Sequence, residues 1–338
     1  MAQTSPVAFK PLPIGACFLF SLALCLTPAG TGPARAAEKI RLAMPVVGVQ
    51  YAPFYFGSKQ GIYGAEGLEL EFSAARTDLA LAALGAGQID YLAHGGAALR
   101  AAARGFPLKL VYALDDKAAF WLATRPEIQN NEALKGKKIG VSFPGDTPHI
   151  VLKRFLRKQG LDPEKDVIYV SGQFSPIGLQ GLMAGALDAA VLAPPFSALA
   201  EEKGLRILAF LGKEVPDAPT VNGLVTSEKK IRSQPQQVKR LVRATLKSVQ
   251  LYRQQKDLGV AFLAAEFKLS NTIARKVYHD TVGLLTPNGE VTPEKLRDVL
   301  EMARETGENN PVFPPADAIL DFSFLRQAQK ELAKGRRL

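Results

Sequence analysis

The stretch Leu84–Asp90 (LGAGQID) recurs 98 positions later as Leu182–Asp188 (LMAGALD). A shorter likeness, Lys59–Gly61 (KQG), recurs 99 positions later as Lys158–Gly160. Two likenesses in the same order and at nearly the same offset indicate an internal repeat. In the longer motif a glycine ends a predicted helix and an aspartate begins the strand that returns. We therefore interpret these residues as structural and not catalytic, and we predict two units of the same kind.

Short apolar runs alternate with helix-like stretches around each copy of the motif. In the first unit we predict strands at 40–47, 68–72, 91–93 and 108–114, and helices at 54–63, 79–87 and 97–105. In the second unit we predict strands at 138–143, 167–170, 189–193 and 206–211, and helices at 148–160, 177–186 and 198–204. This alternation favours parallel-rich sheets with helices on both faces. The predicted fold class is therefore α/β.

A helical tail follows the second unit. After a further strand at 221–227, we predict helices at 235–252, 271–282, 294–304 and 316–332. Pro235 lies near the first turn of the first helix, while Ser270 and Thr292 are suited to cap the second and third. Because the sheet of the first unit still lacks cover, we expect this tail to pack against it.

The composition limits the class of protein. The chain has 338 residues, of which 47% are hydrophobic and 22% charged, which is typical of a globular protein and excludes a disordered or fibrous one. At roughly 100–200 residues per domain, about two domains are expected. Both cysteines, Cys17 and Cys25, lie near the N-terminus. The rest of the chain therefore has no disulfide scaffold, thiolate zinc site, iron–sulfur cluster or cysteine nucleophile.

Residues 1–36 are predicted to be an export signal. They contain a 13-residue apolar run, Ile14–Leu26, which is shorter than the roughly 20 residues that span a membrane. Ala34–Ala36 supplies a small-x-small pattern, so we predict cleavage after Ala36. An uncleaved anchor is the alternative. The stretch Ile14–Cys17 imitates a lipoprotein site, but the apolar run follows the cysteine instead of preceding it, so we predict no lipid.

The basic surplus of the chain is scattered. The formal net charge is +10, and removal of residues 1–36 takes away Lys10 and Arg35 but no acidic residue, leaving 40 basic and 32 acidic residues. A nucleic-acid surface would gather its basic residues in one patch. Here they recur on amphipathic helical stretches such as Val238–Arg243, and the cluster Lys135–Lys138 is interpreted as a turn into the next strand. We predict no nucleic-acid partner.

Signatures of catalysis are missing from the sequence. It has no G-x-x-x-x-G-K-[ST] phosphate loop, no G-x-S-x-G nucleophile elbow and no H-E-x-x-H metal motif. The histidines His94, His149 and His279 lack metal-ligand spacing, and His279 is expected to be exposed. We predict no catalytic residue, metal or cofactor. The pair Asp115–Asp116 ends a predicted strand and would suit an amine ligand or acid–base chemistry, but we favour a solvated turn.

Loops at the carboxyl ends of the predicted strands have the composition of a small-molecule pocket. These loops are residues 49–54, 94–96, 145–148, 172–176 and 193–196. Ligands of open α/β sheets collect at such ends, near unpaired N–H groups of helices. The loops combine glycines and small polar residues with the aromatics Tyr51, Phe54, Phe174 and Phe196, a mixture expected of a pocket. The alternative for any one loop is that its aromatics belong to the core; for the whole set we predict a pocket.

A series of motifs between about residues 39 and 227 follows a distinctive order and spacing. They are Ala52–Tyr55, Gly61–Tyr63, Glu66–Leu68, Leu84–Asp90, Ala102–Pro107, Leu134–Val141, Gly160–Pro163 and Asp188–Phe196. Together they resemble the exported solute-binding proteins of ATP-driven uptake systems, in the nitrate/sulfonate/taurine and thiamine-precursor group. The likeness continues more loosely through the helical tail, and the predicted export signal agrees with it.

This resemblance implies a fold and a function. The fold would be a two-lobed type II periplasmic-binding-protein clamshell with C-terminal helices. Lobe 1 would comprise residues 37–118 and 217–338, and lobe 2 residues 119–216, with the hinge near Phe120–Trp121 and Pro216–Asn222. A monomer in the periplasm would capture a small solute between its lobes and deliver it to a membrane permease of the ABC type with its ATPase.

The resemblance also implies which residues bind the solute. By position in the family they are Gln50, Tyr51, Phe54, His94 and Gly95 from lobe 1, and Gly145, Asp146, Thr147, Phe174, Ser175, Pro195 and Phe196 from lobe 2. Gln50 and Thr147 would hydrogen-bond the solute, and His94 would pair with an anionic group. The aromatic residues would stack on the solute or exclude water.

The class of solute stays open between two kinds. A sulfonate or nitrate would need an arginine or several N–H donors, for which only Arg76 lies near enough, and Asp146 would repel an anion unless it points away. The aromatic content favours an organic solute such as an aromatic acid or a pyrimidine. Two alternatives remain: an enzyme on the same fold, similar to a pyrimidine-precursor synthase or to menaquinone-pathway enzymes, and a structural protein of the envelope.

Overall fold

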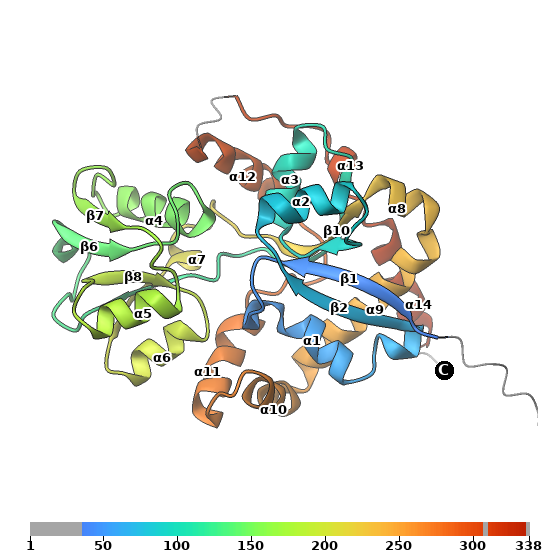
Figure 1. Ribbon diagram of the computed structural model, residues 1–338, viewed down its shortest axis with the longest axis horizontal. Helices are drawn as coiled ribbons and strands as arrows, with labels where there is room; N and C mark the ends of the chain where they lie inside the picture. Colours follow the sequence, from blue (N-terminus) through green and yellow to red (C-terminus); the bar gives the residue numbers. More distant parts are fainter. Residues whose placement is uncertain (1–35, 307–309, 336–338) are drawn as a thin grey trace, which may run out of the picture. The chain divides into compact units, whose positions relative to one another are not determined.

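The computed structural model describes residues 36–306 and 310–335. In this part of the chain the strands form two five-stranded mixed sheets with helices around each (Figure 1). The first sheet, ordered β2-β1-β3-β10-β4, consists of β1 (Glu38–Met44), β2 (Leu68–Ala74), β3 (Tyr91–Leu92), β4 (Leu108–Asp115) and β10 (Asn222–Ser227). The second sheet, ordered β7-β6-β8-β5-β9, consists of β5 (Trp121–Thr124), β6 (Lys137–Gly140), β7 (Val167–Val170), β8 (Ala189–Leu192) and β9 (Arg206–Phe210). The predicted α/β class is confirmed, while the predicted export signal falls outside the described residues.

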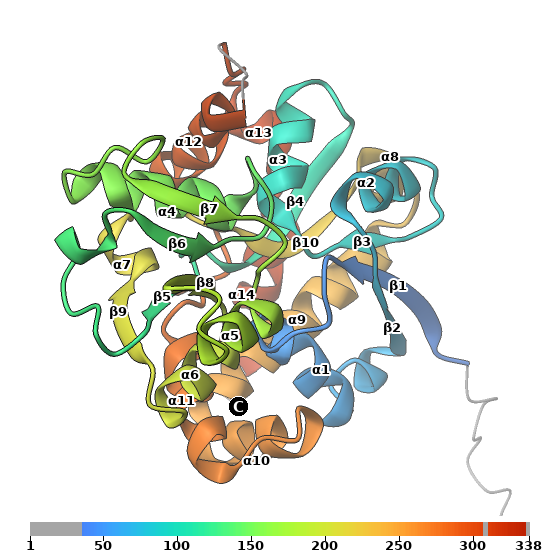
Figure 2. The same cartoon turned by 60° about the vertical axis from the view of Figure 1, so that its left-hand side comes forward.

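The two sheets repeat one arrangement of strands, and Figure 2 turns the second sheet toward the viewer. In the first sheet β1 pairs in parallel with β2 and β3, and β10 runs antiparallel to β3 and β4. In the second sheet β6 pairs in parallel with β7 and β8, and β5 runs antiparallel to β8 and β9. Each sheet has a parallel trio, then an antiparallel strand, then an outer strand. This correspondence confirms the internal repeat.

The repeated aspartate has the same structural task in both sheets. The Asp90 carboxylate accepts a hydrogen bond from the backbone N–H of Arg41 at 2.9 Å, and the Asp188 carboxylate accepts one from that of Lys138 at 2.9 Å. Each aspartate N–H returns a bond to the carbonyl of the same residue. Gly87 ahead of Asp90 has φ 74°, a left-handed conformation that glycine adopts without strain. The motif therefore joins the returning strand, β3 or β8, to its parallel neighbour, β1 or β6, as its structural interpretation predicts.

Each sheet also has its own connecting helices. Those of the first sheet are η1 (Val49–Tyr51), α1 (Ala52–Lys59), η2 (Gly64–Glu66), α2 (Thr77–Gly85) and α3 (Gly95–Ala103). Those of the second sheet are η3 (Glu132–Leu134), α4 (Thr147–Lys158), α5 (Pro176–Met183), α6 (Phe196–Glu202) and α7 (Leu211–Glu214). The helices predicted at α1–α6 are confirmed, with ends that differ by a few residues. The predicted turn at the lysine cluster is also confirmed, because Gly136 has φ 75° and Lys137 begins β6.

The tail packs on the first sheet, as predicted. It consists of α8 (Glu228–Ser233), α9 (Pro235–Gln254), α10 (Lys256–Glu266), α11 (Asn271–Val282), α12 (Pro293–Glu301), η4 (Met302–Thr306), α13 (Ala316–Ile319) and α14 (Ser323–Gly335). Helix α9 contacts α1 and α14, and both α13 and α14 contact β4. Ser270 and Thr292 cap α11 and α12 by accepting the N–H groups of Ile273 and Lys295. Buried side chains such as Leu42 and Leu241 join strand and tail in one core.

One predicted element was wrong, and β5 and the helices α7, α8 and α10 were not predicted. The helix expected at 316–332 is two helices, because Leu320 forms a parallel bridge with Leu110 and the Asp321 N–H donates to the Leu110 carbonyl. Asp321 then accepts the Ser323 N–H and starts α14. Strand β5 was not predicted, although it pairs with β8 and β9 along both edges.

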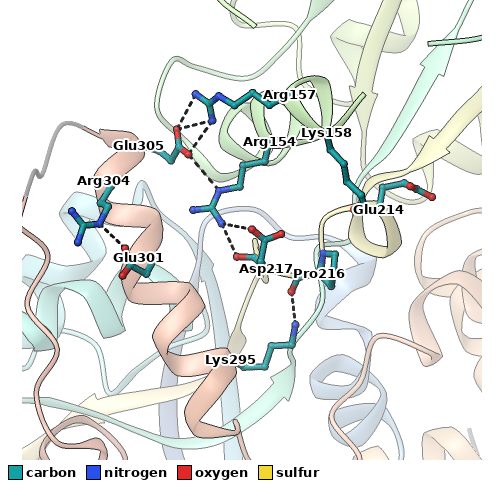
Figure 3. Close-up of polar contacts among 10 residues, drawn as sticks. All are labelled: Arg154, Arg157, Lys158, Glu214, Pro216, Asp217, Lys295, Glu301, Arg304 and Glu305. Carbon is teal, nitrogen blue, oxygen red and sulfur yellow. Dashed lines mark hydrogen bonds and ion pairs between the residues drawn. The ribbon is translucent and has the colours of Figure 1, made fainter. Parts of the chain in front are cut away.

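Ion pairs connect α4, which belongs to the second sheet, with the segment after α12 (Figure 3). The Glu305 carboxylate on η4 lies 3.4 Å from the Arg154 guanidinium and 3.1 Å from that of Arg157. Arg154 also donates to the Asp217 carbonyl at 2.7 Å, and Lys295 donates to the Pro216 carbonyl. These contacts link the turn at Pro216–Asp217, ahead of β10, with both α4 and α12. Over the described ranges, no helix is both long and apolar enough to cross a membrane.

Candidate functional site

The loop after β1 carries three of the predicted binding residues. Gln50 is partly buried on η1, whereas Tyr51 and Phe54 are buried in the core of the first sheet. The Tyr51 hydroxyl donates to the Asn222 side-chain carbonyl at 3.2 Å. Phe54 has no exposed surface, which matches the alternative that loop aromatics belong to the core. Of these three residues, Gln50 is the one that is partly exposed to solvent.

The interpretation of Asp115 as part of a solvated turn was wrong. Asp115 is 4% exposed at the end of β4. Its carboxylate accepts the Asn222 backbone N–H at 2.9 Å and the Asn222 side-chain amide at 2.8 Å. Burial raises the pKa of Asp115 to about 7 against the opposing effect of these bonds, and the neighbouring Asp116 adds to the rise. Sequence reasoning missed this pairing because Asn222 begins β10, 107 residues further along the chain.

His94 lies at the start of α3 and has no charge to offer an anion at neutral pH. Its ring Nδ1 is 2.9 Å from the Thr77 hydroxyl. Burial, assisted by the nearby Arg100 charge, lowers the pKa of His94 to about 4. Next to it, a side chain on Gly95 would come within 2.8 Å of the Val221 carbonyl. The neutral ring opposes the predicted pairing of His94 with an anionic group, while leaving it free to act as a hydrogen-bonding group.

In the loop after β6, the acidic residue Asp146 forms hydrogen bonds within the loop and with the start of α4. The Asp146 carboxylate accepts the backbone N–H groups of His149 at 3.3 Å and Phe143 at 3.1 Å, and so caps α4. Gly145, with φ 81°, donates its N–H to His149 Nδ1 at 3.0 Å. Thr147 is the first residue of α4 and is partly exposed. The Asp146 charge is therefore directed into its own loop, which removes the repulsion that the sequence raised against an anion.

The loops after β7 and β8 are joined through Ser175. Its hydroxyl accepts the Ala193 N–H at 3.2 Å, and its φ of 53° is rare for a residue with a side chain. Such strained conformations concentrate at functional sites. Phe174 is partly buried and meets Phe120 edge to face, with ring centroids 6.0 Å apart. Pro195 and Phe196 at the start of α6 are partly exposed.

The structure therefore gathers the predicted residues in two groups. Gln50, Tyr51, His94 and Gly95 follow the parallel strands β1 and β3 of the first sheet, and the others except Phe54 follow β6, β7 and β8 of the second. Arg76, the proposed anion ligand, is 79% exposed and pairs with Asp78 at 2.9 Å. His279 is 88% exposed, as expected. No group of three or more potential metal ligands occurs among residues 36–306 and 310–335.

The two mixed α/β sheets and their connecting helices form a fold that solved periplasmic binding proteins share. Residues 49–257 match the model of the family described as NMT1/THI5 like, and the chain belongs to this family. It is 24% identical to the riboflavin-binding protein RibY of Chloroflexus aurantiacus over 261 residues, which cover 71% of this chain and 73% of RibY.

Solved structures of transport proteins share the fold. The sulfonate-binding protein SsuA of Methylobacillus flagellatus is 18% identical, with a TM-score of 0.70 over 88% of this chain and 96% of SsuA. The nitrate-binding protein NrtA of Synechocystis is 14% identical, with a TM-score of 0.63 over 88% of this chain and 89% of NrtA. Both are described as periplasmic.

An enzyme shares the fold as well. DszB, a desulfurization enzyme solved in complex with biphenyl-2-sulfinic acid, is 17% identical, with a TM-score of 0.63 over 87% of this chain and 99% of DszB. The fold is therefore compatible with both binding and catalysis, and the choice between them depends on the residues of the site.

Proposed function

We propose that this chain is the extracytoplasmic substrate-binding component of an ABC importer. Residues 37–118 with 217–338 would form one lobe and residues 119–216 the other. The lobes would close on a small solute, and the closed form would deliver it to a membrane permease that an ATPase drives. A solute shifts such an equilibrium by binding the closed state more tightly than the open one.

The observation that carries this proposal is the repetition of the sheet together with its loops. Both sheets bring their predicted residues to the carboxyl ends of a parallel trio, where α/β proteins bind ligands. The chain passes between the sheets twice, from β4 to β5 and from β9 to β10. Two such passages would act as a hinge. RibY, SsuA and NrtA are binding proteins by name and add support from the family and the fold.

Export belongs to the same proposal. Residues 1–36 would be removed after Ala36, and the mature chain would work as a monomer in the periplasm. The apolar run and the small-x-small pattern in the sequence support cleavage. Permease, ATPase and solute are then the partners, and neither nucleic acid nor a cofactor enters the proposal.

We further propose that the solute is organic and not a small inorganic anion. Arg76 already pairs with Asp78, and His94 is neutral near pH 7. Asp115, buried at the end of β4, is an acid and offers an anion no attraction. Phe174 and Phe196 in the second-sheet loops keep partly exposed rings, which suit a flat organic molecule. This chemistry favours the pyrimidine-like solute over the aromatic acid.

A binding role fits the site better than catalysis. The chain from residue 37 onward has no cysteine, so a thiolate nucleophile is unavailable there. The Asp146 carboxylate is held by two backbone N–H groups, and the His94 ring is held by Thr77. Neither is arranged as a nucleophile with its base.

Thermal unfolding with a panel of solutes tests the proposal. The panel would contain riboflavin, pyrimidines, aromatic carboxylates, sulfonates, nitrate and amino acids. A ligand at about 100 times its dissociation constant stabilises the fold by about 2.7 kcal/mol. That raises the midpoint by several degrees, at about 2–4 °C per kcal/mol in a domain of about 150–250 residues. A stabilising solute that is recovered unchanged is the expected result. Chemical turnover of that solute, or silence across the whole panel, would contradict it.

A further inference from the structure

A small cavity with both polar and apolar walls lies behind the loop that carries Gln50. Its volume is about 10 Å³, close to the space that a single water molecule or an ammonium group fills. Asp115, Gln50, Tyr252 and Thr281 contribute its polar side chains, and Leu284 and Leu285 its apolar wall. The cavity therefore joins a predicted binding residue of η1 to a buried acid at the end of β4.

The acid in this cavity has no counter-charge. None of the ion pairs formed within residues 36–306 and 310–335 includes Asp115. The nearest charged neighbour along the strand is Asp116, which has the same sign. The Lys117 ammonium donates to the Gly283 carbonyl, and the Arg253 guanidinium donates to the carbonyls of Leu285 and Thr286. A buried charge without a partner is costly, so this carboxylate favours either a proton or a cation.

Two polar side chains that line the cavity, Tyr252 and Asp115, can form more hydrogen bonds than they do. The Tyr252 hydroxyl, on a side chain 1% exposed, interacts weakly with the Thr281 hydroxyl and makes no hydrogen bond of normal length. Each oxygen of Asp115 accepts a single bond, in both cases from Asn222, whereas a carboxylate oxygen can accept two. A buried polar group without a partner in a native fold calls for an explanation. A bound donor with several hydrogens would satisfy all three oxygens.

The fold itself does not require a polar pair at this place. In the first sheet Asn222 and Asp115 are cross-strand partners, and at the equivalent place in the second sheet the partners are Trp121 and Phe210. Those two rings stack with centroids 4.5 Å apart. Since an apolar pair holds the same strands together there, the buried acid is not explained by the needs of the sheet.

We propose that this cavity is a subsite for a nitrogen of the bound solute, an ammonium or amino group that donates to Asp115, Tyr252 and Gln50. The assignment rests on the proposed binding function and narrows its substrate class to amines and amino-heterocycles. Tyr51 and Asn222 are positioning residues, because the Tyr51 hydroxyl holds the Asn222 amide and that amide holds the carboxylate. The raised pKa of Asp115 is consistent with a buried acid that has no cation beside it.

A titration without any solute tests the subsite directly. The Asp115 carboxyl would be followed by carbon NMR against pH, in ammonium, potassium or tetramethylammonium chloride at the same ionic strength of about 0.1 M. Ammonium is expected to lower the Asp115 midpoint relative to tetramethylammonium, which is too large for the cavity. Tyr252→Phe should reduce that shift. Tyr91→Phe, which removes an equally buried and unpaired hydroxyl from β3, should leave it unchanged.

Two results would overturn the subsite. One is the same midpoint in ammonium and tetramethylammonium; the other is an equal effect of potassium, which would make the cavity an alkali-cation site. Matched solutes then extend the test: 4-aminopyrimidine should bind about 10-fold or more tightly than 4-methylpyrimidine, and Asp115→Asn should abolish that preference. If 4-aminopyrimidine and 4-methylpyrimidine bind equally tightly, the subsite is contradicted but the proposed function is not. If ammonium shifts the Asp115 midpoint but no solute of the panel binds, the proposed function is contradicted but the subsite is not.

Discussion

Two cross-strand pairs occupy the same place in the two sheets and differ completely in chemistry. Asn222 and Asp115 in the first sheet form a buried hydrogen-bonded pair, and Trp121 and Phe210 in the second form an aromatic stack. Both pairs lie where the chain passes from one sheet to the other. The stack shows what strand pairing needs at this place, namely packed apolar surface. The polar pair adds a buried acid that stability alone does not favour. Under the proposed function, this difference assigns the recognition of the solute's polar group to the first sheet.

Removing the stack should have the largest effect on stability. Trp121 is 7% exposed and its ring lies against Phe210, so Trp121→Ala deletes a buried aromatic and leaves a cavity. We expect a loss of about 3–5 kcal/mol in the free energy of unfolding, measured by urea denaturation. Trp121→Phe, which keeps an aromatic ring, should lose less than half of that. Equal losses for the two variants would show that the stack itself contributes little.

The Asn222–Asp115 pair should make the free energy of unfolding depend on pH. The pKa of Asp115 is raised in the folded state, so the folded chain binds more protons than the unfolded chain between about pH 4 and 7. Stability should therefore fall as pH rises through this window, by about 2 kcal/mol between pH 5 and 7. Asp115→Asn removes the titrating group and should flatten the profile. Denaturation midpoints that show the same slope in variant and wild type would rule out Asp115 as its source.

The repeated aspartates offer a finer comparison. Burial alone would raise the pKa of Asp90, but bonds from Arg41 and Lys230 lower it to about 2. The folded-state pKa is below the unfolded one, so this stabilisation is present above about pH 4 and is lost as pH falls toward 2. Asp90→Asn should cost about 2 kcal/mol at neutral pH.

Asp188→Asn is the matched control, since the Asp188 carboxylate accepts a hydrogen bond from the Lys138 backbone N–H at the equivalent position. An asparagine can still accept that bond, and we expect a loss of about 0.5–1 kcal/mol. Chemical denaturation at pH 7 and pH 3 compares the pair. If the two variants lose the same free energy at pH 7, the ion pairs of Asp90 contribute nothing.

The smallest effect concerns the two loops that begin the helices α1 and α4. Asp146 caps α4, whereas α1 has no side-chain cap. Asp146→Ala should therefore cost about 1 kcal/mol of stability. Gln50→Ala on the first-sheet loop should leave the unfolding midpoint unchanged and weaken the binding of solute. Calorimetry on both variants separates the roles, and a stability loss at Gln50 equal to that at Asp146 would contradict the distinction.

Much of the fold followed from local pattern. The repeat around Asp90 and Asp188 predicted two equivalent units, and the caps at Ser270 and Thr292 marked helix starts that the structure confirms. Strand β5 and the break at Leu320 were missed because both depend on pairing with distant strands. Local sequence carries little information about such tertiary contacts.

The site was predicted less completely than the fold. The loops were found, because glycine and proline mark strand ends whatever the partner. Tertiary packing decides which side chains of these loops are exposed to solvent. The burial of Tyr51 and Phe54 could therefore not be predicted from the sequence. Asp115 was noticed but assigned to a solvated turn, since its partner Asn222 lies 107 positions further along the chain. Sequence alone therefore indicated the loops of the proposed site but not the buried residues behind them.

The most direct test of the account is a distance measurement between the two sheets. The chain from residue 37 onward has no cysteine, so Arg76→Cys and Lys165→Cys at exposed positions would provide unique sites for spin labels. We predict that the panel solute giving the largest rise in unfolding midpoint shortens the mean distance between the labels, and that a solute without effect on the midpoint leaves it unchanged. An unchanged distance in the presence of a bound solute would contradict the closing of two lobes on their ligand.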